Sequence, residues 1–306
     1  MNPRLIIIAG PTGIGKSIIS LDIAHAFRGE IISADSMQVY RFMDIGTAKP
    51  SPEDRALVPH HLIDVVDPDE EFNAALYGNE ARRVIGKLHE NKKNILVIGG
   101  TGLYIRVLTG GLVPGPGRDA GLRDIFRQEI ERYGTAYLHE RLKEKDRDAA
   151  ERIHPNDAVR LMRALEVIEL SGESIVAQQK NHGFGDRPYE CLKIGLMEDR
   201  GRLYEKIDRR CDEMIEKGLV GEVENLLARG YSESLKPMQS LGYRHMIAYL
   251  KGTMSLDEAV TRMKRDTRNY AKRQLTWFRA DGEIVWFNPG DRDGIKKRIG
   301  DFLSGR

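Results

Sequence analysis

The stretch that decides the fold is LIIIAGPTGIGKS, residues 5–17. A short apolar run rich in β-branched residues stops at Gly10, the spacing G-x-x-x-x-G-K-S follows, and an amphipathic segment begins at Ile18. Strand, glycine-rich loop and helix in this order are the setting in which such a loop cradles phosphate. The glycines let successive N–H groups and the helix N-terminus surround an anion. The stretch therefore predicts a phosphate site.

The side chains of this loop fit the same purpose. Lys16 brings a full positive charge, and the Ser17 hydroxyl is placed to bind a Mg²⁺ that shields the phosphates. The alternative is a glycine-rich turn that matches the spacing by accident, and the flanking strand and helix argue against it. The motif does not identify the phosphate compound. The residues expected to bind it are Gly10, Pro11, Thr12, Gly13, Ile14, Gly15, Lys16 and Ser17.

Composition indicates a globular protein with balanced charge. The 306 residues are 41% hydrophobic and 31% charged, enough for one large domain or two moderate ones. The formal net charge of +2 gives no signal for or against nucleic acid. Cys191 and Cys211 stand outside any C-x-x-C pair, so neither disulfides nor a zinc site is indicated. We expect a cytoplasmic protein, because the sequence has neither a signal-peptide pattern nor an apolar run of membrane length.

Strand and helix patterns alternate through the first hundred residues. Apolar segments at 30–33, 61–66 and 94–98 follow the first helix, with a helical pattern at 72–89 between the last two. This alternation predicts an α/β protein with a parallel, doubly wound sheet and ligands at the carboxyl ends of its strands. Asp35 and Thr101 each follow such an end, as the glycine loop does. One site should therefore contain all three.

Two stretches rich in glycine and proline, 110–117 and 183–188, divide the chain. All patterns between them are helical, whereas strand character returns at 191–197 and again at 283–287. We expect a core domain of residues 1–114 and 189–306 and a helical insertion domain of residues 115–188. With a hinge at each end, the insertion could swing over the site as a lid.

Asp35 is the acidic residue at the rim of the core strands. A P-loop NTPase usually holds its metal with a further carboxylate after a later strand, but here that strand ends in Gly99 and Gly100. This departure argues against an ordinary NTP hydrolase and leaves Asp35 available to take a proton from a nucleophile. The structural alternatives are that Asp35 only caps a turn and that Thr101 only bonds its own backbone.

A long helical pattern at 255–279 begins with a capping box, Ser255 followed three residues on by Glu258. One side of this helix is basic and the other apolar, which suits a phosphate backbone, although a solvated helix face is the alternative. In the insertion, Asp157 should cap a helix that carries two arginines one turn apart. The basic residues on these helices are Arg262, Arg265, Arg268, Lys272, Arg160 and Arg163.

These motifs together resemble one family, the bacterial tRNA dimethylallyltransferases, also called isopentenyl-tRNA transferases. The resemblance implies a P-loop NTPase-like fold and transfer of a dimethylallyl group from dimethylallyl diphosphate to N6 of the adenosine 3′-adjacent to the anticodon. The tRNAs implied are those that read codons beginning with U, and the enzyme would be a monomer that needs Mg²⁺. The matching stretches are GPTGIGKS (10–17), ISADSMQVY (32–40), MDIGTAKP (43–50), HHLIDVVDP (60–68), GGTGLY (99–104), RIHPNDAVRLMRALEV (152–167), LGYR (241–244) and AKRQLTWFR (271–279).

The resemblance also implies residue roles. Lys16 would bind the donor diphosphate within the loop 10–17, Ser17 would bind Mg²⁺, and Arg210 would help to hold the diphosphate. Asp35 would be the general base, with Thr101 beside the reacting groups. The implied tRNA contacts are Asp35, Ser36, Met37, Gln38, Thr101, Arg123, Val159, Arg160, Leu161, Met162, Arg163 and Arg244, and we add Arg265 and Arg268 of the basic helix.

Three other functions stay open at this point. A kinase for small molecules or nucleoside monophosphates would have a similar core and a similar lid, although the missing second carboxylate counts against it. A prenyltransferase could use free adenine nucleotides in place of tRNA. A protein without catalytic activity could bind RNA and sense a nucleotide through its loop.

Overall fold

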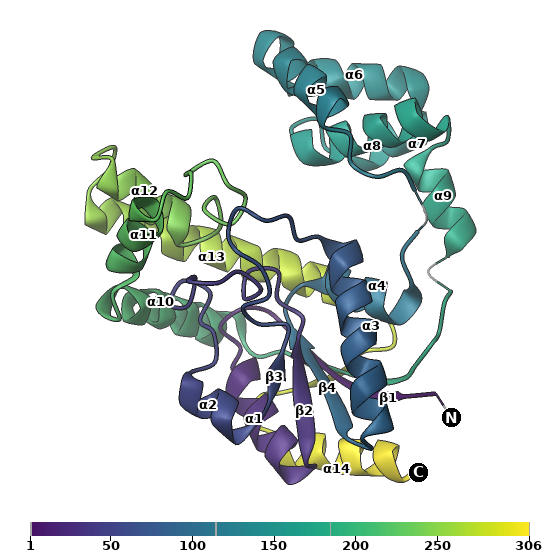
Figure 1. The fold of residues 1–306 in the computed structure, drawn as a ribbon, viewed down its shortest axis with the longest axis vertical. Coiled ribbons are helices and arrows are strands. Elements are labelled where there is room, and N and C mark those ends of the chain that lie inside the picture. Colours follow the sequence, from purple (N-terminus) through teal and green to yellow (C-terminus); the bar gives the residue numbers. More distant parts are fainter. Residues whose placement is uncertain (1, 114, 184, 306) are drawn as a thin grey trace. The chain divides into compact units, whose positions relative to one another are not determined.

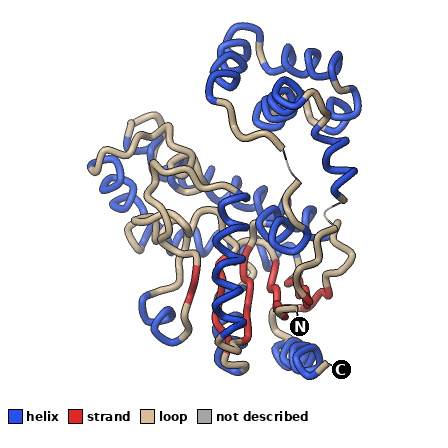
Figure 2. Tube along the Cα trace, turned by 45° about the vertical axis from the view of Figure 1, so that its right-hand side comes forward, coloured by secondary structure: helices blue, strands red, loops and turns tan. Residues whose placement is uncertain are grey.

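The strands of this protein form one sheet at the centre of the core (Figures 1 and 2). The computed structural model describes residues 2–113, 115–183 and 185–305, so Pro114 and Phe184 of the two expected hinges lie outside the described residues. Within these ranges six strands pair in the order β3-β2-β4-β1-β5-β6, each parallel to its neighbour. The strands are β1 (Arg4–Ala9), β2 (Gly29–Ser33), β3 (His60–His61), β4 (Asn94–Gly99), β5 (Glu190–Leu196) and β6 (Val285–Phe287).

The helices of the core cover both faces of this sheet. α1 leads from β1 to β2 and α3 leads from β3 back to β4, so the two crossovers run in opposite directions along the sheet. Right-handed crossovers then put α1 and α3 on opposite faces. Lys296 of α14 pairs with Asp22 of α1 at 2.8 Å, which joins those two helices. The core helices are α1 (Lys16–Ala26), α2 (Pro52–Leu57), α3 (Ala74–Glu90), α4 (Gly102–Gly110), α10 (Arg200–Glu216), α11 (Leu219–Ala228), α12 (Tyr243–Leu250), α13 (Leu256–Arg279) and α14 (Arg292–Ser304).

The central strands β1 and β4 are apolar along almost their whole length because they are buried on both faces and paired on both sides. At their carboxyl ends the chain turns tightly. Ala34 donates its N–H to Ile98 O at 2.7 Å and accepts from Thr101 N at 3.1 Å. A Cβ on Gly99 would lie 2.1 Å from Ala34 O, so only glycine fits there. This contact brings the loops after β2 and β4 together beside the glycine loop.

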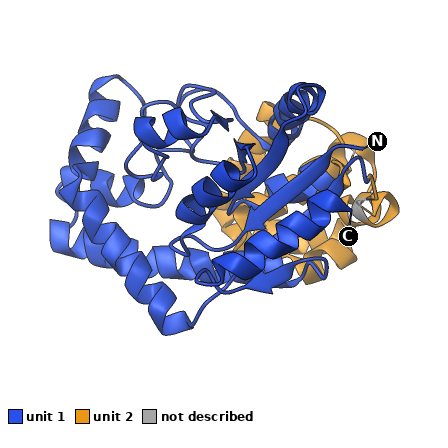
Figure 3. Ribbon diagram, turned by 90° about the horizontal axis from the view of Figure 1, so that it is seen from below, with its two compact units in different colours: residues 1–109, 187–306 blue, residues 110–186 orange. Residues whose placement is uncertain are grey.

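Residues 110–186 form a second compact unit, drawn in orange in Figure 3, and residues 1–109 with 187–306 form the first. Among its described residues the second unit contains helices and no strand (Figure 2). Its own apolar core includes Phe126, Leu138 and Leu142. Its helices are α5 (Ala120–Tyr133), α6 (Thr135–Lys145), α7 (Arg147–Arg152), α8 (Ala158–Ser171) and α9 (Ile175–His182).

Several local structures differ from the sequence-based expectation. Of the apolar segment 61–66, only its first residue belongs to a strand, because β3 ends at His61. The helix α4, which begins at Gly102 soon after β4, was not predicted. Neither α2 nor α14 was predicted. The long basic helix was predicted, and both hydrogen bonds of the Ser255 capping box are present. No helix among the described residues is long and apolar enough to cross a membrane.

Candidate active site

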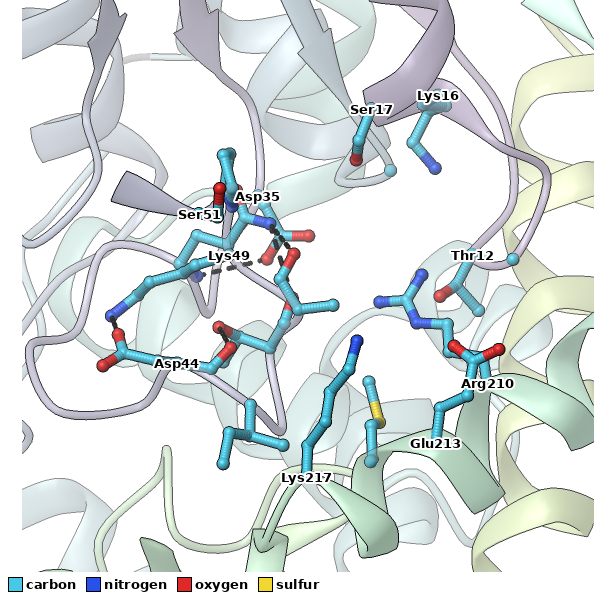
Figure 4. Close-up of a pocket in the computed structure, with 18 of the residues that line it drawn as sticks. Thr12, Lys16, Ser17, Asp35, Asp44, Lys49, Ser51, Arg210, Glu213 and Lys217 are labelled. Carbon is cyan, nitrogen blue, oxygen red and sulfur yellow. Dashed lines mark hydrogen bonds and ion pairs between the residues drawn. The ribbon is translucent and has the colours of Figure 1, made fainter. Parts of the chain in front are cut away.

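The glycine loop borders a cavity of about 1020 Å³ at the carboxyl ends of the strands, which we call the donor cavity (Figure 4). A second cavity of about 310 Å³, which we call the acceptor cavity, lies beside it and is lined by Ser36, Met37 and Arg244 among others. Both cavities are in the first unit. The residues that border both are Thr12, Asp35, Thr47, Arg210, Met214 and Tyr270.

The backbone of the glycine loop is held in a conformation that needs glycine. Gly13 and Gly15 have φ angles of 81° and 93°, which favour glycine, and a Cβ on Gly13 would lie 2.7 Å from Ile207 of α10. Gly15 is the N-cap of α1 and offers no side chain to the first N–H groups of that helix. Those N–H groups are therefore free to bind an anion.

Lys16 bends back over the loop. Its Nζ donates to Gly10 O at 2.9 Å and to Pro11 O at 2.8 Å. Burial and the positive charge of Arg210 lower the pKa of Lys16 from 10.5 to about 7, while the negative charge of Asp35 opposes that shift. A phosphate group beside Lys16 would favour its charged form.

The donor set around Ser17 fits Mg²⁺ only when phosphate supplies most of the ligands. Ser17 is exposed at the donor cavity. The described residues contain no group of three or more His, Cys, Asp or Glu side chains that could hold a metal ion. Since Mg²⁺ commonly keeps several waters and binds substrate phosphates with one or two protein groups, a single hydroxyl beside a phosphate loop suits it.

Asp35 both forms a turn and faces the cavities. Its Oδ1 accepts from Met37 N at 2.8 Å and from Gln38 N at 3.4 Å, so the capping alternative is realised at one oxygen. No hydrogen bond is recorded for Oδ2 within the described parts of the chain. The hydroxyl oxygen of Thr101 accepts from Ser36 N at 3.0 Å, so its hydrogen remains available for donation. Both residues can therefore serve the turn and the reaction together.

Arg210 projects from α10 into the donor cavity (Figure 4). The described carboxylates all lie beyond ion-pair distance from its half-buried guanidinium. Burial lowers the pKa of Arg210, and the nearby charge of Asp35 counteracts that effect. A half-buried cation without an ion pair is costly unless an anion joins it. Arg210 is thus suited to meet the phosphates held by the glycine loop.

Gln274 of α13 joins two of these loops, a role that the sequence did not predict. Its Oε1 accepts from Thr12 N at 2.9 Å, and its Nε2 donates to Gly100 O at 2.9 Å. The side chain is buried, and a Cβ on Gly100 would lie 2.3 Å from its amide nitrogen. Gln274 therefore fixes the glycine loop relative to the loop that carries Thr101.

The expected basic stripe on α13 is only partly available to RNA. Arg268 donates to both carboxylate oxygens of Asp208 at 2.7 and 2.6 Å, so its guanidinium is held in an ion pair, and its contact with RNA stays a prediction. Arg265 is 62% exposed and contacts Asp266, which also binds Arg244 at 2.6 Å. Asp208 lies on α10, so the Arg268 pair joins two helices. Arg262 and Lys272 are exposed.

Some of the expected RNA contacts of the second unit are buried or ion-paired within that unit, and others are exposed. Leu161 is fully buried in the core of that unit, so its side chain is not available to RNA. Arg123 and Arg163 both bind the Glu166 carboxylate, which is fully buried. Val159 and the side chain of Arg160 are 69% and 67% exposed. Met162 is half-buried.

Glu166 is the anion that holds these arginines. Burial alone would raise its pKa, but hydrogen bonds from Arg123 and Arg163 outweigh burial and hold that pKa at about 2. Arg163 also donates to Pro116 O at 2.9 Å. Both arginines therefore stabilise the start of the second unit, whatever contact they make with RNA.

With this geometry described, the chain can be compared with known proteins. Residues 38–281 match the sequence profile of the family described as IPP transferase. The chain belongs to this family. It is similar to tRNA dimethylallyltransferase 2 of Syntrophus aciditrophicus, 56% identical over 303 residues that cover 99% of this chain and 97% of that relative. It is also similar to tRNA dimethylallyltransferase of Desulfatibacillum aliphaticivorans, 51% identical with 98% of each chain covered.

Solved structures of IPP transferases have the same fold. A full-length tRNA isopentenylpyrophosphate transferase from Bacillus halodurans matches with a TM-score of 0.73 at 40% identity, covering 99% of this chain and 96% of that one. A eukaryotic dimethylallyltransferase acting on tRNA matches with a TM-score of 0.81 at 28% identity, covering 99% and 80%. The expected P-loop NTPase-like fold with a parallel sheet is therefore confirmed.

Proposed function

We propose that this IPP transferase moves a dimethylallyl group from dimethylallyl diphosphate to N6 of the adenosine 3′-adjacent to the anticodon, in tRNAs that read codons beginning with U. The observation that carries the proposal is that the cavity bordered by the glycine loop and a second cavity meet at Asp35 and Arg210. The relatives at about half identity over nearly their whole length, named tRNA dimethylallyltransferases, support the same activity.

The donor cavity is suited to a diphosphate leaving group. Breaking the carbon–oxygen bond of the donor puts negative charge on the diphosphate and positive charge on the allylic carbon. The loop N–H groups, Lys16 and Arg210 border the cavity where that negative charge would develop, and such preorganised electrostatic stabilisation is usually the largest single contribution to catalysis. Mg²⁺ bound at Ser17 would add positive charge to the same oxygens.

The acceptor cavity is suited to an adenine extruded from the anticodon loop. Its N6 amine is a poor nucleophile, so a placed carboxylate that takes the proton contributes roughly 10²–10⁴-fold to the rate. Asp35 borders both cavities and has one oxygen outside its turn. In the step, the N6–carbon bond forms, the carbon–oxygen bond breaks, the proton passes to Asp35, and the diphosphate leaves.

The experiment that tests this function uses the full chain with unmodified tRNA, Mg²⁺ and dimethylallyl diphosphate, followed by digestion of the RNA and mass analysis. One added C₅H₈ on the adenosine beside the anticodon is the expected result. ATP-dependent phosphate transfer without prenyl transfer would indicate a kinase. Efficient competition by AMP as acceptor would indicate a free-nucleotide prenyltransferase, and RNA binding without any mass gain would indicate a binding protein.

A further inference from the structure

Residues 43–50, which we call the wall loop, line both cavities although they form neither helix nor strand. Asp44 and Ile45 border the donor cavity, Gly46 borders the acceptor cavity, and Thr47 borders both. A loop that shapes a site keeps its position only if groups outside the loop hold it. The structure provides such a group on α11.

Glu222 of α11 accepts four hydrogen bonds, three of them from consecutive N–H groups of the wall loop. Its Oε2 accepts from Asp44 N at 2.9 Å and from Ile45 N at 2.7 Å, and its Oε1 accepts from Gly46 N at 3.0 Å. The Tyr243 hydroxyl donates to the same Oε1 at 2.6 Å. Four donors match the acceptor capacity of an ionised carboxylate.

Tyr243 fixes the loop by shape as well. A Cβ on Gly46 would lie 2.4 Å from the Tyr243 ring, so the backbone of Gly46 packs directly against that ring. Tyr243 is fully buried, and burial together with the Glu222 charge raises the pKa of its hydroxyl well above the usual value. The hydroxyl therefore stays protonated and donates to Glu222 at all ordinary pH values.

The position of the wall loop affects the site through hydrogen bonds to Gln38. Gln38 donates from Nε2 to Ala48 O at 3.3 Å and, more weakly, to Thr47 O at 3.4 Å, while its Oε1 accepts from Ser33 Oγ at 2.9 Å. The Thr47 hydroxyl donates to Met43 O at 2.6 Å. The orientation of Gln38, in the same turn as Asp35, thus depends on the loop that Glu222 holds.

The far end of the wall loop has an independent anchor. Lys49, whose side chain is 1% exposed, donates to Tyr40 O at 2.6 Å and pairs with Asp44 and Asp64 at 2.7 and 2.6 Å. Loss of Glu222 would therefore loosen residues 44–48 while Lys49 still ties the loop to Tyr40 and Asp64. We expect a local defect at the junction of the cavities and not unfolding.

We propose that Glu222 is a positioning residue that, with Tyr243, holds the wall loop and so places Thr47, which borders both cavities, and Gln38, which borders the donor cavity. Glu222 borders neither cavity and acts through the loop. The proposal rests on the proposed function, because Gly46 and Thr47 of the wall loop border the acceptor cavity and Gln38 is expected to contact the target nucleotide, while the glycine loop holds the donor. Loss of Glu222 should therefore affect the RNA substrate more than the donor.

The test compares Glu222→Gln with the wild type, with Glu222→Asp, and with Glu224→Gln as a control on an exposed position of the same helix. The glutamine amide would direct its own N–H groups at backbone donors. We expect Glu222→Gln to lower kcat/KM for tRNA at least about tenfold while KM for dimethylallyl diphosphate changes less than about threefold. Glu222→Asp should recover part of the loss, and Glu224→Gln should match the wild type. Tyr243→Phe, which removes one of four donors, should have an intermediate effect.

The outcomes separate this proposal from the proposed function. A wild-type chain without prenyl transfer to tRNA would refute the function itself. A wild-type chain that is active while folded Glu222→Gln keeps its kinetic constants would refute the positioning role alone. A variant that only lowers the unfolding temperature, or that raises both KM values equally, would also refute it.

Discussion

At the scale of single residues, Lys16 shows how the site prepares for its ligand. Burial and Arg210 lower its pKa to about 7, so a substantial fraction of Lys16 in the free protein is neutral at slightly alkaline pH. A bound diphosphate adds negative charge beside Nζ and raises that pKa again. Donor binding above pH 7 therefore takes up protons, and the affinity for the donor falls as pH rises.

We expect calorimetric titration of dimethylallyl diphosphate into the wild type at pH about 8 to reveal proton uptake, as a difference in apparent enthalpy between buffers of different ionisation enthalpy. Lys16→Arg is the matched control, because a guanidinium stays protonated throughout this range. Its uptake should be smaller than that of the wild type. Equal uptake by the two proteins would contradict the role of Lys16.

Asp35→Asn tests the general base. Asparagine keeps the side-chain oxygen that accepts from Met37 N, so the turn should persist. Without a carboxylate to take the amine proton, we expect kcat to fall roughly 10²–10⁴-fold while the dissociation constants for donor and tRNA stay close to those of the wild type. Single-turnover transfer and binding measurements check this. Asp69→Asn, at an exposed position, should leave transfer unchanged; a similar loss there, or near-normal transfer by Asp35→Asn, would refute the assignment.

At the scale of elements, α13 connects the two sides of the site. Gln274 faces the glycine loop, whereas Arg268 faces α10 through Asp208. One side of α13 therefore makes contacts within the core. Sequence periodicity identified this side only approximately, because it assigned Arg268 to the side that faces RNA. Its exposed cations, including Arg262 and Arg265, remain predicted RNA contacts.

Gln274→Leu should loosen the glycine loop. The change leaves Thr12 N–H and Gly100 O without their partner, which costs about 1–3 kcal/mol of unfolding free energy for each group that water does not reach. We expect a lower urea midpoint and a higher KM for the donor. Gln274→Glu, which can still accept from Thr12 N, should be less harmful to donor binding. Equal donor KM for the wild type and Gln274→Leu would count against this bridge.

The basic side of α13 can be tested by salt dependence. Log affinity for RNA falls linearly with log salt concentration. Removing an exposed phosphate contact makes this negative slope shallower by up to about one unit. Arg262→Ala and Arg265→Ala should each make this slope shallower for tRNA binding. Arg268→Ala should instead destabilise the fold, because Asp208 loses its partner. A wild-type slope in both exposed variants would remove α13 from the RNA interface.

The elements also indicate which features a sequence pattern can predict. The glycine loop, the strands predicted at 30–33 and 94–98 and the Ser255 capping box are local signals, and the structure confirms them, whereas the segment 61–66 is a strand only at His61. Gln274 is 262 residues from Thr12, and Glu222 is 178 residues from Asp44, so no local period or spacing reveals either contact. The Ser51–Asp54 capping box of α2 was not predicted, because this helix has only six residues and none of them is buried. The assigned roles of the site residues remain predictions.

At the scale of the whole molecule, the two units have separate cores and separate polar anchors. Glu166, buried with Arg123 and Arg163, anchors the second unit. Its pKa of about 2 lies below the ordinary 4.5, so the unfolded chain binds more protons between these values. The stability that this group contributes is present above about pH 4.5 and is lost as pH falls toward 2.

Glu166→Gln should therefore destabilise the second unit at neutral pH, by about 3–5 kcal/mol if both arginines lose their anion. The difference from the wild type should shrink as pH falls below 4.5, where the wild-type carboxyl begins to lose its advantage in stability. Denaturant unfolding at several pH values, monitored by hydrogen exchange in each unit, measures this. A difference that is constant from neutral to acid pH would contradict the buried ion-pair account.

The central claim is that a prenyl diphosphate and one extruded adenosine meet at Asp35. The most direct measurement is the mass of two tRNAs after incubation with the full chain, Mg²⁺ and dimethylallyl diphosphate. The tRNAs differ only in carrying adenosine or guanosine 3′-adjacent to an anticodon that reads a codon beginning with U. We predict one added C₅H₈ on that adenosine and no mass gain in the guanosine tRNA. Equal gain in both tRNAs, or gain in neither, would contradict the account.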